Sequence, residues 1–125
     1  MRRAHPTLTP NELAIMKVVW ELEKATVRDV YEALRAKRDV AYTTVMTMMK
    51  ILEEKGYLKK TRADRAHVYR PSRPRQQVIG AMVRDFLDRV FDGAAGPLLV
   101  QLAKDGKLSD ADKEKIRKLA GEIEE

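Results

Sequence analysis

The sequence is poor in the residues on which catalysis and metal binding depend. Its 125 residues include no cysteine and two histidines, His5 and His67, which excludes disulfides and thiolate ligands and leaves few ligands for a transition-metal site. It contains no glycine-rich phosphate loop, no HExxH pattern and no paired-carboxylate pattern. We therefore expect no enzyme, no bound metal and no cofactor.

Long apolar runs are also missing. The longest uninterrupted stretch, residues 78–83, is far shorter than a membrane span. Residues 1–6 are basic, but they lead into no apolar run and so do not resemble a signal peptide. We expect a cytoplasmic protein that does not insert into membranes, built as one domain or as a small domain with an accessory piece.

Charge is distributed unevenly along the chain. Residues 1–75 hold 17 Lys and Arg against 9 Asp and Glu, a net charge of +8, whereas residues 76–125 carry a net charge of −2. This asymmetry suggests that the front half binds a polyanion and that the back half has another role. Taken alone, the pattern is explained equally well by an unevenly charged, solvated surface.

Two helices near the N-terminus are marked by their caps. Thr9 stands three residues before Glu12, which is the spacing of a capping box, and a proline follows Thr9 at the first helical position. Thr26 and Asp29 repeat this spacing at the start of a second helix. Apolar residues then recur at helical spacing, so both helices have a core face, on which Trp20 is expected to anchor the packing.

A third helix is predicted over residues 42–55, and its two faces differ. The face expected to pack on the core consists of Val45, Met48, Met49 and Leu52. The roughly opposite face carries Thr43, Met46, Thr47 and Lys50. Thr44 borders this second face near the helix N-terminus, where a hydroxyl and backbone amides suit a phosphate. Gly56 follows as the left-handed residue that ends the helix.

A basic hairpin is predicted after this helix, with strands over residues 57–62 and 66–70 joined by residues 63–65. Three helices followed by such a hairpin make a winged helix, whose third helix enters the DNA major groove. Without the helices, an exposed hairpin with solvated Lys and Arg would be the better explanation. The predicted DNA-binding residues are Tyr42, Thr43, Thr44, Met46, Thr47, Lys50, Arg62, Arg65 and His67.

The back half is predicted to be helical over about residues 72–91, residues 98–103 and a last segment that Ser109 caps. A segment this small rarely buries enough apolar surface alone, so its apolar faces need a partner. That partner is either the winged helix or a second copy of the chain. We favour the second copy, because a two-fold axis would present two recognition helices to a palindromic site.

The predicted fold is therefore mostly α-helical and has two domains. Residues 1–71 form an N-terminal winged helix-turn-helix of three helices and a β-hairpin wing, and residues 72–125 form a C-terminal helical dimerisation domain. The predicted dimerisation residues are Val78, Ile79, Met82, Val83, Phe86, Leu87, Val90, Phe91, Leu98, Leu102, Ile116 and Leu119.

Six short segments form an ordered pattern between residues 9 and 124: LAIMKVVW at 13–20, TVRDV at 26–30, AYTTVMT at 41–47, EKGYL at 54–58, DRAHVY at 64–69 and LSD at 108–110. In this order and spacing, the chain resembles the penicillinase repressor family of the BlaI, MecI and CopY type. The resemblance implies a dimeric transcriptional repressor that binds palindromic operators. In the best-studied members, a membrane sensor-protease system triggered by β-lactams leads to cleavage within the dimerisation domain, which releases the DNA.

The sequence departs from that family at three points. The staphylococcal members have basic residues at the positions of Thr43 and Met46, so we expect a different operator here. Gln101 and Leu102 stand where those members have the Asn-Phe pair that is cleaved, so the same proteolytic release is not carried over. The copper-responsive branch uses a C-terminal cysteine cluster, and this chain has no cysteine.

We thus predict a homodimeric repressor that recognises double-stranded operator DNA through the helix at 42–55 and a basic wing. The alternative is a winged-helix adaptor whose third helix binds another protein, and the net charge of the front half argues against it. A metal-dependent hydrolase is a distant third, because the ligands are missing. The operator sequence, the regulated genes, the inducing signal and the dimer geometry are left open.

Overall fold

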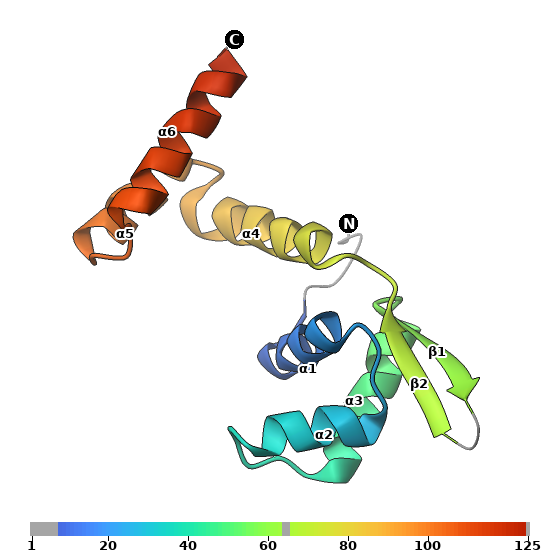
Figure 1. Cartoon of the computed structure of the whole chain (residues 1–125). Coiled ribbons are helices and arrows are strands. Elements are labelled where there is room, and N and C mark those ends of the chain that lie inside the picture. Colours follow the sequence, from blue (N-terminus) through green and yellow to red (C-terminus); the bar gives the residue numbers. More distant parts are fainter. Residues whose placement is uncertain (1–7, 64–65, 125) are drawn as a thin grey trace. The chain divides into compact units, whose positions relative to one another are not determined.

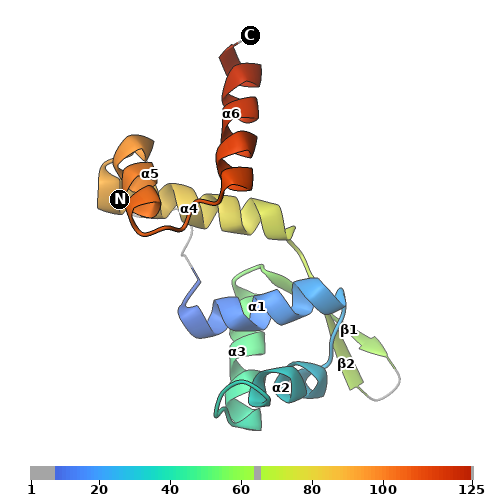
Figure 2. The ribbon, with the colours of Figure 1, turned by 60° about the vertical axis from the view of Figure 1, so that its left-hand side comes forward.

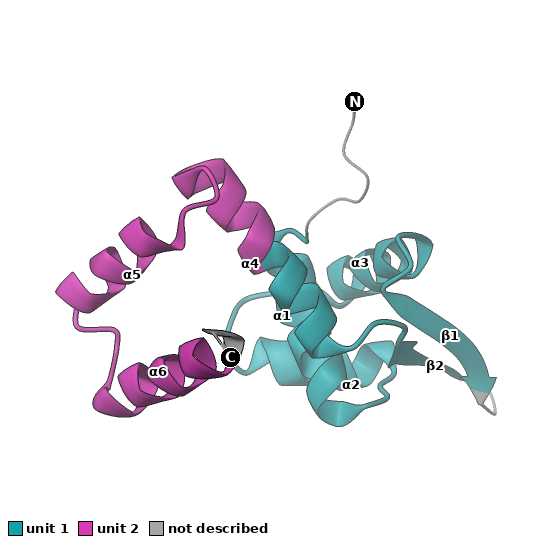
Figure 3. Ribbon diagram, turned by 90° about the horizontal axis from the view of Figure 1, so that it is seen from above, with its two compact units in different colours: residues 1–82 teal, residues 83–125 magenta. Residues whose placement is uncertain are grey.

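The computed structural model describes residues 8–63 and 66–124. The chain divides into two compact units, residues 1–82 and residues 83–125 (Figure 3). The first unit holds three helices and a two-stranded antiparallel sheet (Figure 1): α1 (Pro10–Leu22), α2 (Val27–Arg35), α3 (Tyr42–Glu54), β1 (Leu58–Ala63) and β2 (Ala66–Pro71). This is the winged helix-turn-helix that the sequence predicts, with every element within a few residues of its expected bounds.

Capping boxes start the first two helices, and Thr9 and Thr26 are the N-caps that the sequence predicts. The Thr9 hydroxyl accepts the Glu12 amide at 3.2 Å, and the Glu12 carboxylate accepts the Thr9 amide at 2.9 Å. Thr26 and Asp29 exchange the same pair of hydrogen bonds, each at 3.0 Å. Each box satisfies amides that the first helical turn leaves without a partner.

The core of the first unit lies between the three helices and the base of the hairpin. α3 contacts α1, α2 and β1, and Figure 2 shows it lying against the other two helices. Seven side chains are almost completely buried there: Ile15, Met16, Val19, Val30, Val45, Met49 and Leu52. Burial of this apolar surface is the main term that stabilises a fold of this size.

A Schellman motif joins α3 to the hairpin. Gly56 has a φ of 89°, in the left-handed region that its sequence position predicts. The Tyr57 amide donates to the Leu52 carbonyl at 2.9 Å, and the Gly56 amide donates to the Glu53 carbonyl at 3.0 Å. The chain therefore turns sharply at this point, and the hairpin extends away from the helices (Figure 1).

The hairpin is tied to the helices at its base. Tyr69 is buried, and its backbone exchanges two hydrogen bonds with Ala25, which lies in the connection between α1 and α2. The indole of Trp20 is half-buried and donates to the Arg73 carbonyl at 3.0 Å, just beyond β2. Trp20 thus anchors the packing, as predicted, and also fixes the chain that leaves the wing.

Three helices make up the remainder of the chain: α4 (Arg75–Phe91), α5 (Ala95–Lys104) and α6 (Asp110–Glu124). α4 begins later than the predicted start near residue 72. α5 begins earlier than predicted, because Pro97 lies in its first turn, where the missing proline amide costs no hydrogen bond. Ser109 caps α6 with Asp112, as its sequence predicts. Among the described residues, no helix combines the length and the apolar character needed to cross a membrane.

The division between the two units falls within α4, at residues 82 and 83, whereas the predicted domain boundary is at residues 71 and 72. Val78 is 4% exposed and belongs to the core of the first unit, and Met82 packs against that core. Val78 is therefore covered within a single chain, so a second copy would bury little more of it. The role of residues 72–125 in dimerisation stays a prediction.

Candidate nucleic-acid interface

The two faces of α3 differ in burial as the sequence predicts. On the inward face Val45, Met49 and Leu52 are fully buried, and Met48 is half-buried at its edge. These contacts with α1 and α2 fix the rotation of α3 about its own axis. Because the inward face is packed in the core, the opposite face of α3 points to solvent.

The outward face of α3 is open to solvent. The predicted contact residues on this helix are all exposed: Tyr42, Thr43, Thr44, Met46, Thr47 and Lys50. Met46 is 45% exposed and stands on this face between the threonines. The threonines offer hydroxyls and methyl groups, which suit base edges and phosphates, and Lys50 adds a positive charge.

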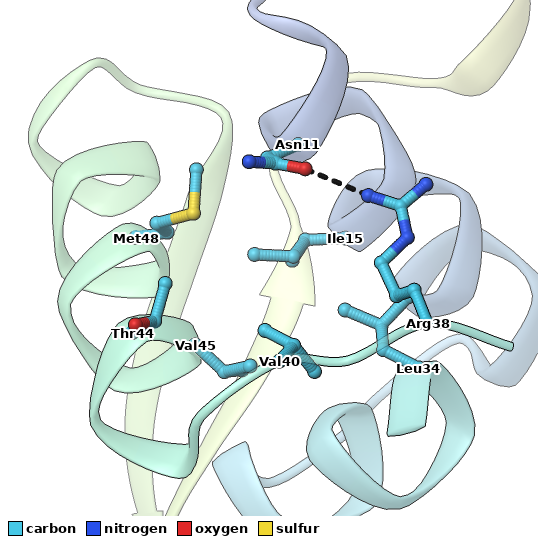
Figure 4. A pocket seen from close by; sticks show the side chains of 8 residues that line it. All are labelled: Asn11, Ile15, Leu34, Arg38, Val40, Thr44, Val45 and Met48. Carbon is cyan, nitrogen blue, oxygen red and sulfur yellow. Dashed lines mark hydrogen bonds between the residues drawn. The ribbon is translucent and has the colours of Figure 1, made fainter. Parts of the chain in front are cut away.

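Thr44 faces a different side of α3 from Thr43 and Thr47. It lines a small apolar hollow where the start of α1, the end of α2 and α3 come together (Figure 4). At the rim, Arg38 donates to the Asn11 side-chain oxygen at 2.7 Å. Thr44 is exposed near the N-terminus of α3, and its predicted contact with a phosphate stays a prediction.

The wing carries further positive charge. Arg62 and His67 are exposed and lie opposite each other in the hairpin register. Lys59 is exposed, and Lys60 lies 3.7 Å from the Glu53 carboxylate at the end of α3. Arg65, the other wing residue predicted to bind DNA, lies outside the described residues.

One buried ion pair was not predicted from the sequence. Glu12 is 4% exposed, and its carboxylate oxygens lie 2.9 Å and 3.1 Å from the Lys55 ammonium nitrogen. Burial alone raises the pKa of the Glu12 carboxyl, but hydrogen bonds from the Thr9 amide and Lys55, together with the charge of Lys55, outweigh it and lower the pKa below its usual value. The pair connects the start of α1 to the end of α3. The sequence shows the capping role of Glu12 through its spacing from Thr9, but it does not show the pairing of Glu12 with Lys55, 43 residues away.

The predicted dimerisation residues present a partly exposed apolar surface. Val83, Phe86, Val90, Ile116 and Leu119 are exposed, to between 39% and 53%. The others are half-buried, apart from the buried Val78: Ile79, Met82, Leu87, Phe91, Leu98 and Leu102. On α4, the rings of Phe86 and Phe91 stack edge to face with centroids 6.0 Å apart. Apolar surface of this kind is typical of helices that pair with another chain.

The chain is similar to proteins named as repressors. The family model described as "Penicillinase repressor" matches residues 8–122. The "Transcriptional regulator BlaI" of Mycobacterium tuberculosis is 37% identical over 115 residues, which are 90% of this chain and 82% of that protein. A "Penicillinase repressor" of Bacillus licheniformis is 27% identical over 120 residues, 96% of this chain and 91% of that one.

Solved structures of BlaI repressors match part of this chain. The solution structure of the DNA-binding domain of the repressor BlaI has a TM-score of 0.52 and 28% identity, and the match covers 60% of this chain and 90% of that one. The Bacillus licheniformis BlaI monomer in complex with the blaP half-operator has a TM-score of 0.51 and 28% identity, and the match covers 57% of this chain and 87% of that one. These relatives are regulators rather than enzymes. With a winged helix-turn-helix and a family match over most of its length, the chain belongs to the penicillinase repressor family.

Proposed function

We propose that this protein is a homodimeric transcriptional repressor that binds a palindromic DNA operator. In this proposal α3 enters the major groove, and Thr43, Met46, Thr47 and Lys50 face the base edges. Tyr42, Thr44, Arg62, Arg65 and His67 contact the backbone around them. Binding to a promoter then blocks transcription, in the cytoplasm where the chromosome lies.

The observation that carries the proposal is the contrast between the two faces of α3. Three side chains of the inward face are fully buried, whereas the outward face leaves Met46 45% exposed between hydroxyl-bearing residues. A solvated helix face usually carries mixed charges, but this one has no acid. A duplex groove covers such a face and pairs with its hydroxyls.

The dimer is supported by the apolar surface of α4 and α6. A stripe that includes Val83, Phe86 and Val90 is costly to leave in water, and a second copy of the chain would cover it. Two copies related by a two-fold axis would read two half-sites about one helical turn (~10 bp) or a multiple apart. The half-operator complex of the Bacillus licheniformis protein is consistent with one winged helix binding one half-site.

The signal that releases the DNA is a separate question. The family resemblance suggests a sensor-protease system as the signalling partner. The pair at the position of the family's cleavage site, Gln101-Leu102, lies within α5, with Gln101 exposed and Leu102 half-buried. Incubating the purified protein with the protease domain of such a sensor, and sequencing any fragments, tests whether this helix is cut.

The proposal is tested by letting the purified full chain select from random DNA duplexes and sequencing what it retains. We expect an enriched palindrome, which is then bound with a Kd that rises steeply as salt is raised from 50 to 200 mM, because each phosphate contact releases counterions. Enrichment of no sequence, or a Kd that does not change with salt, would contradict the proposal. The protein–protein adaptor would then be the better reading.

A further inference from the structure

A cluster of two arginines and two tyrosines lies beside the outward face of α3. Arg28, Tyr31 and Arg35 belong to α2, and Tyr42 is the first residue of α3. The two tyrosine rings meet edge to face, with centroids 5.4 Å apart and planes at 76°. The Arg28 guanidinium carbon lies 5.6 Å from the centre of the Tyr42 ring, and that of Arg35 lies 5.4 Å from the centre of the Tyr31 ring. We call this the arginine–tyrosine cluster.

A single carboxylate is shared between the two arginines. Glu32 lies 3.2 Å from Arg28 and 3.6 Å from Arg35, through its two different oxygens. One negative charge between two positive charges leaves the cluster with a net charge of +1. The nearby Asp29 carboxylate is engaged by the amide of Thr26 at the helix cap.

These ion pairs are open to solvent. The side chains of Arg28, Arg35 and Glu32 are 67%, 55% and 48% exposed. Water and salt screen pairs of this kind, so they contribute little to stability and exchange partners readily. An anion that approaches Arg28 can therefore replace Glu32 at small cost.

The position of Arg28 is set by Tyr42. On a helix, Tyr42 and Met46 are one turn apart and share a side, and Thr43 is the next residue of the outward face. Tyr31 packs against the core, and its edge-to-face contact restrains the Tyr42 ring against which Arg28 lies. The guanidinium therefore stands at the edge of the surface that faces the duplex in the proposed function.

We propose that Arg28 binds a DNA phosphodiester that flanks the base pairs read by α3. The Tyr42 ring holds the guanidinium through a cation–π contact, and the planar fork of the arginine suits two oxygens of one phosphate. Glu32 occupies Arg28 in the free protein and gives it up when DNA binds, so Glu32 weakens DNA binding. This inference rests on the proposed function, and it adds a residue of α2 to the interface.

The test measures the Kd of the full chain for two duplexes at several salt concentrations. One duplex is the palindrome enriched in the selection above, and the other is a scrambled duplex of the same length and composition. Arg28→Ala should weaken binding to both by about three- to tenfold per bound chain, and the slope of log Kd against log salt should fall by about one per bound chain. Glu32→Gln should tighten binding to both.

Matched variants come from another ion pair on a helix. Arg89 and Asp85 on α4 are also four residues apart, at 2.9 Å, and their side chains are 64% and 27% exposed. Arg89→Ala and Asp85→Asn should leave both Kd and slope close to those of the parent protein. Tyr42→Phe keeps the ring, so Arg28→Ala should weaken DNA binding as much in that background as in the parent protein. In the Tyr42→Ala background, which lacks the ring, Arg28→Ala should have a smaller effect.

The outcomes separate this inference from the proposed function. If the parent protein binds both duplexes equally, the proposed sequence-specific repressor is wrong. If the parent discriminates between them but Arg28→Ala changes neither Kd nor slope, Arg28 does not bind phosphate and the inference is overturned. The inference is also overturned if Arg28→Ala weakens binding without changing the slope of log Kd against log salt. The same holds if a lower melting temperature of this variant accounts for the weaker binding.

Discussion

Replacing Lys55 by methionine tests how α3 is fixed in place. Methionine keeps most of the length of the lysine side chain but removes its charge, which leaves the Glu12 carboxylate buried with the hydrogen bond that it accepts from the Thr9 amide. Breaking a fully buried ion pair costs about 3–5 kcal/mol. The Lys55 side chain is 27% exposed, so water partly reaches it, and we expect a loss of about 2–3 kcal/mol in the free energy of unfolding at pH 7.

The pH dependence of this loss follows from the pKa of Glu12. In the parent protein that pKa is lowered, so the carboxylate contributes stability above its unfolded pKa, and this contribution is lost as the pH falls through the folded pKa. In Lys55→Met the charge that opposes desolvation is gone, so the pKa of Glu12 should rise. Protonation then relieves the buried charge, and the difference in stability between variant and parent should shrink as the pH falls from 7 towards 4.

Urea unfolding followed by the fluorescence of the single tryptophan, Trp20, measures both effects. All samples are compared at one protein concentration, because dimerisation couples stability to concentration. Lys17→Met on the exposed face of α1 is the matched control and should change stability by less than about 0.5 kcal/mol. A loss at Lys55→Met no larger than that of the control, or one that grows as the pH falls, would refute the reasoning.

Three further changes test other parts of the account. Thr47→Ala should cost about 1–3 kcal/mol at one base pair and change the ranking of operator variants in binding titrations, and equal weakening on all sequences would contradict a base contact. Gly56→Ala should lower the free energy of unfolding by about 1–2 kcal/mol in urea titrations, because the φ of 89° strains any Cβ, whereas the nearest side-chain atom is 3.5 Å from that Cβ and gives no clash. Phe86→Glu should shift the sedimentation mass from about twice 14.3 kDa to 14.3 kDa, and an unchanged mass would remove α4 from the dimer interface.

Local signals explain why much of the winged helix could be predicted from the sequence. Thr9 and Thr26 each cap a helix by bonding the amide three residues later, and Gly56 ends α3 within one turn. Along α3, apolar residues such as Val45 and polar residues such as Thr47 recur at the helical period, so the sequence predicts which face is buried. Each of these features depends on neighbours in the chain, which the sequence shows directly.

Contacts between distant residues could not be predicted in this way. Glu12 and Lys55 are 43 residues apart, and only the fold brings them together. Arg28 meets Tyr42 for the same reason, across the connection between α2 and α3. The apolar spacing of α4 identifies a buried stripe but not its partner, so it does not reveal that Val78 packs in the first unit.

The central claim is that the outward face of α3 lies in the major groove, and site-specific cross-linking tests it most directly. Because the chain has no cysteine, Thr47→Cys introduces a single thiol on that face. The selected palindrome is made with a disulfide-activated tether on a base, placed at its major-groove edge. We predict a disulfide cross-link at one or two positions in each half-site for Thr47→Cys and none for Lys17→Cys on α1. Cross-links that are absent for Thr47→Cys, or equal for both variants at every position, would contradict the account.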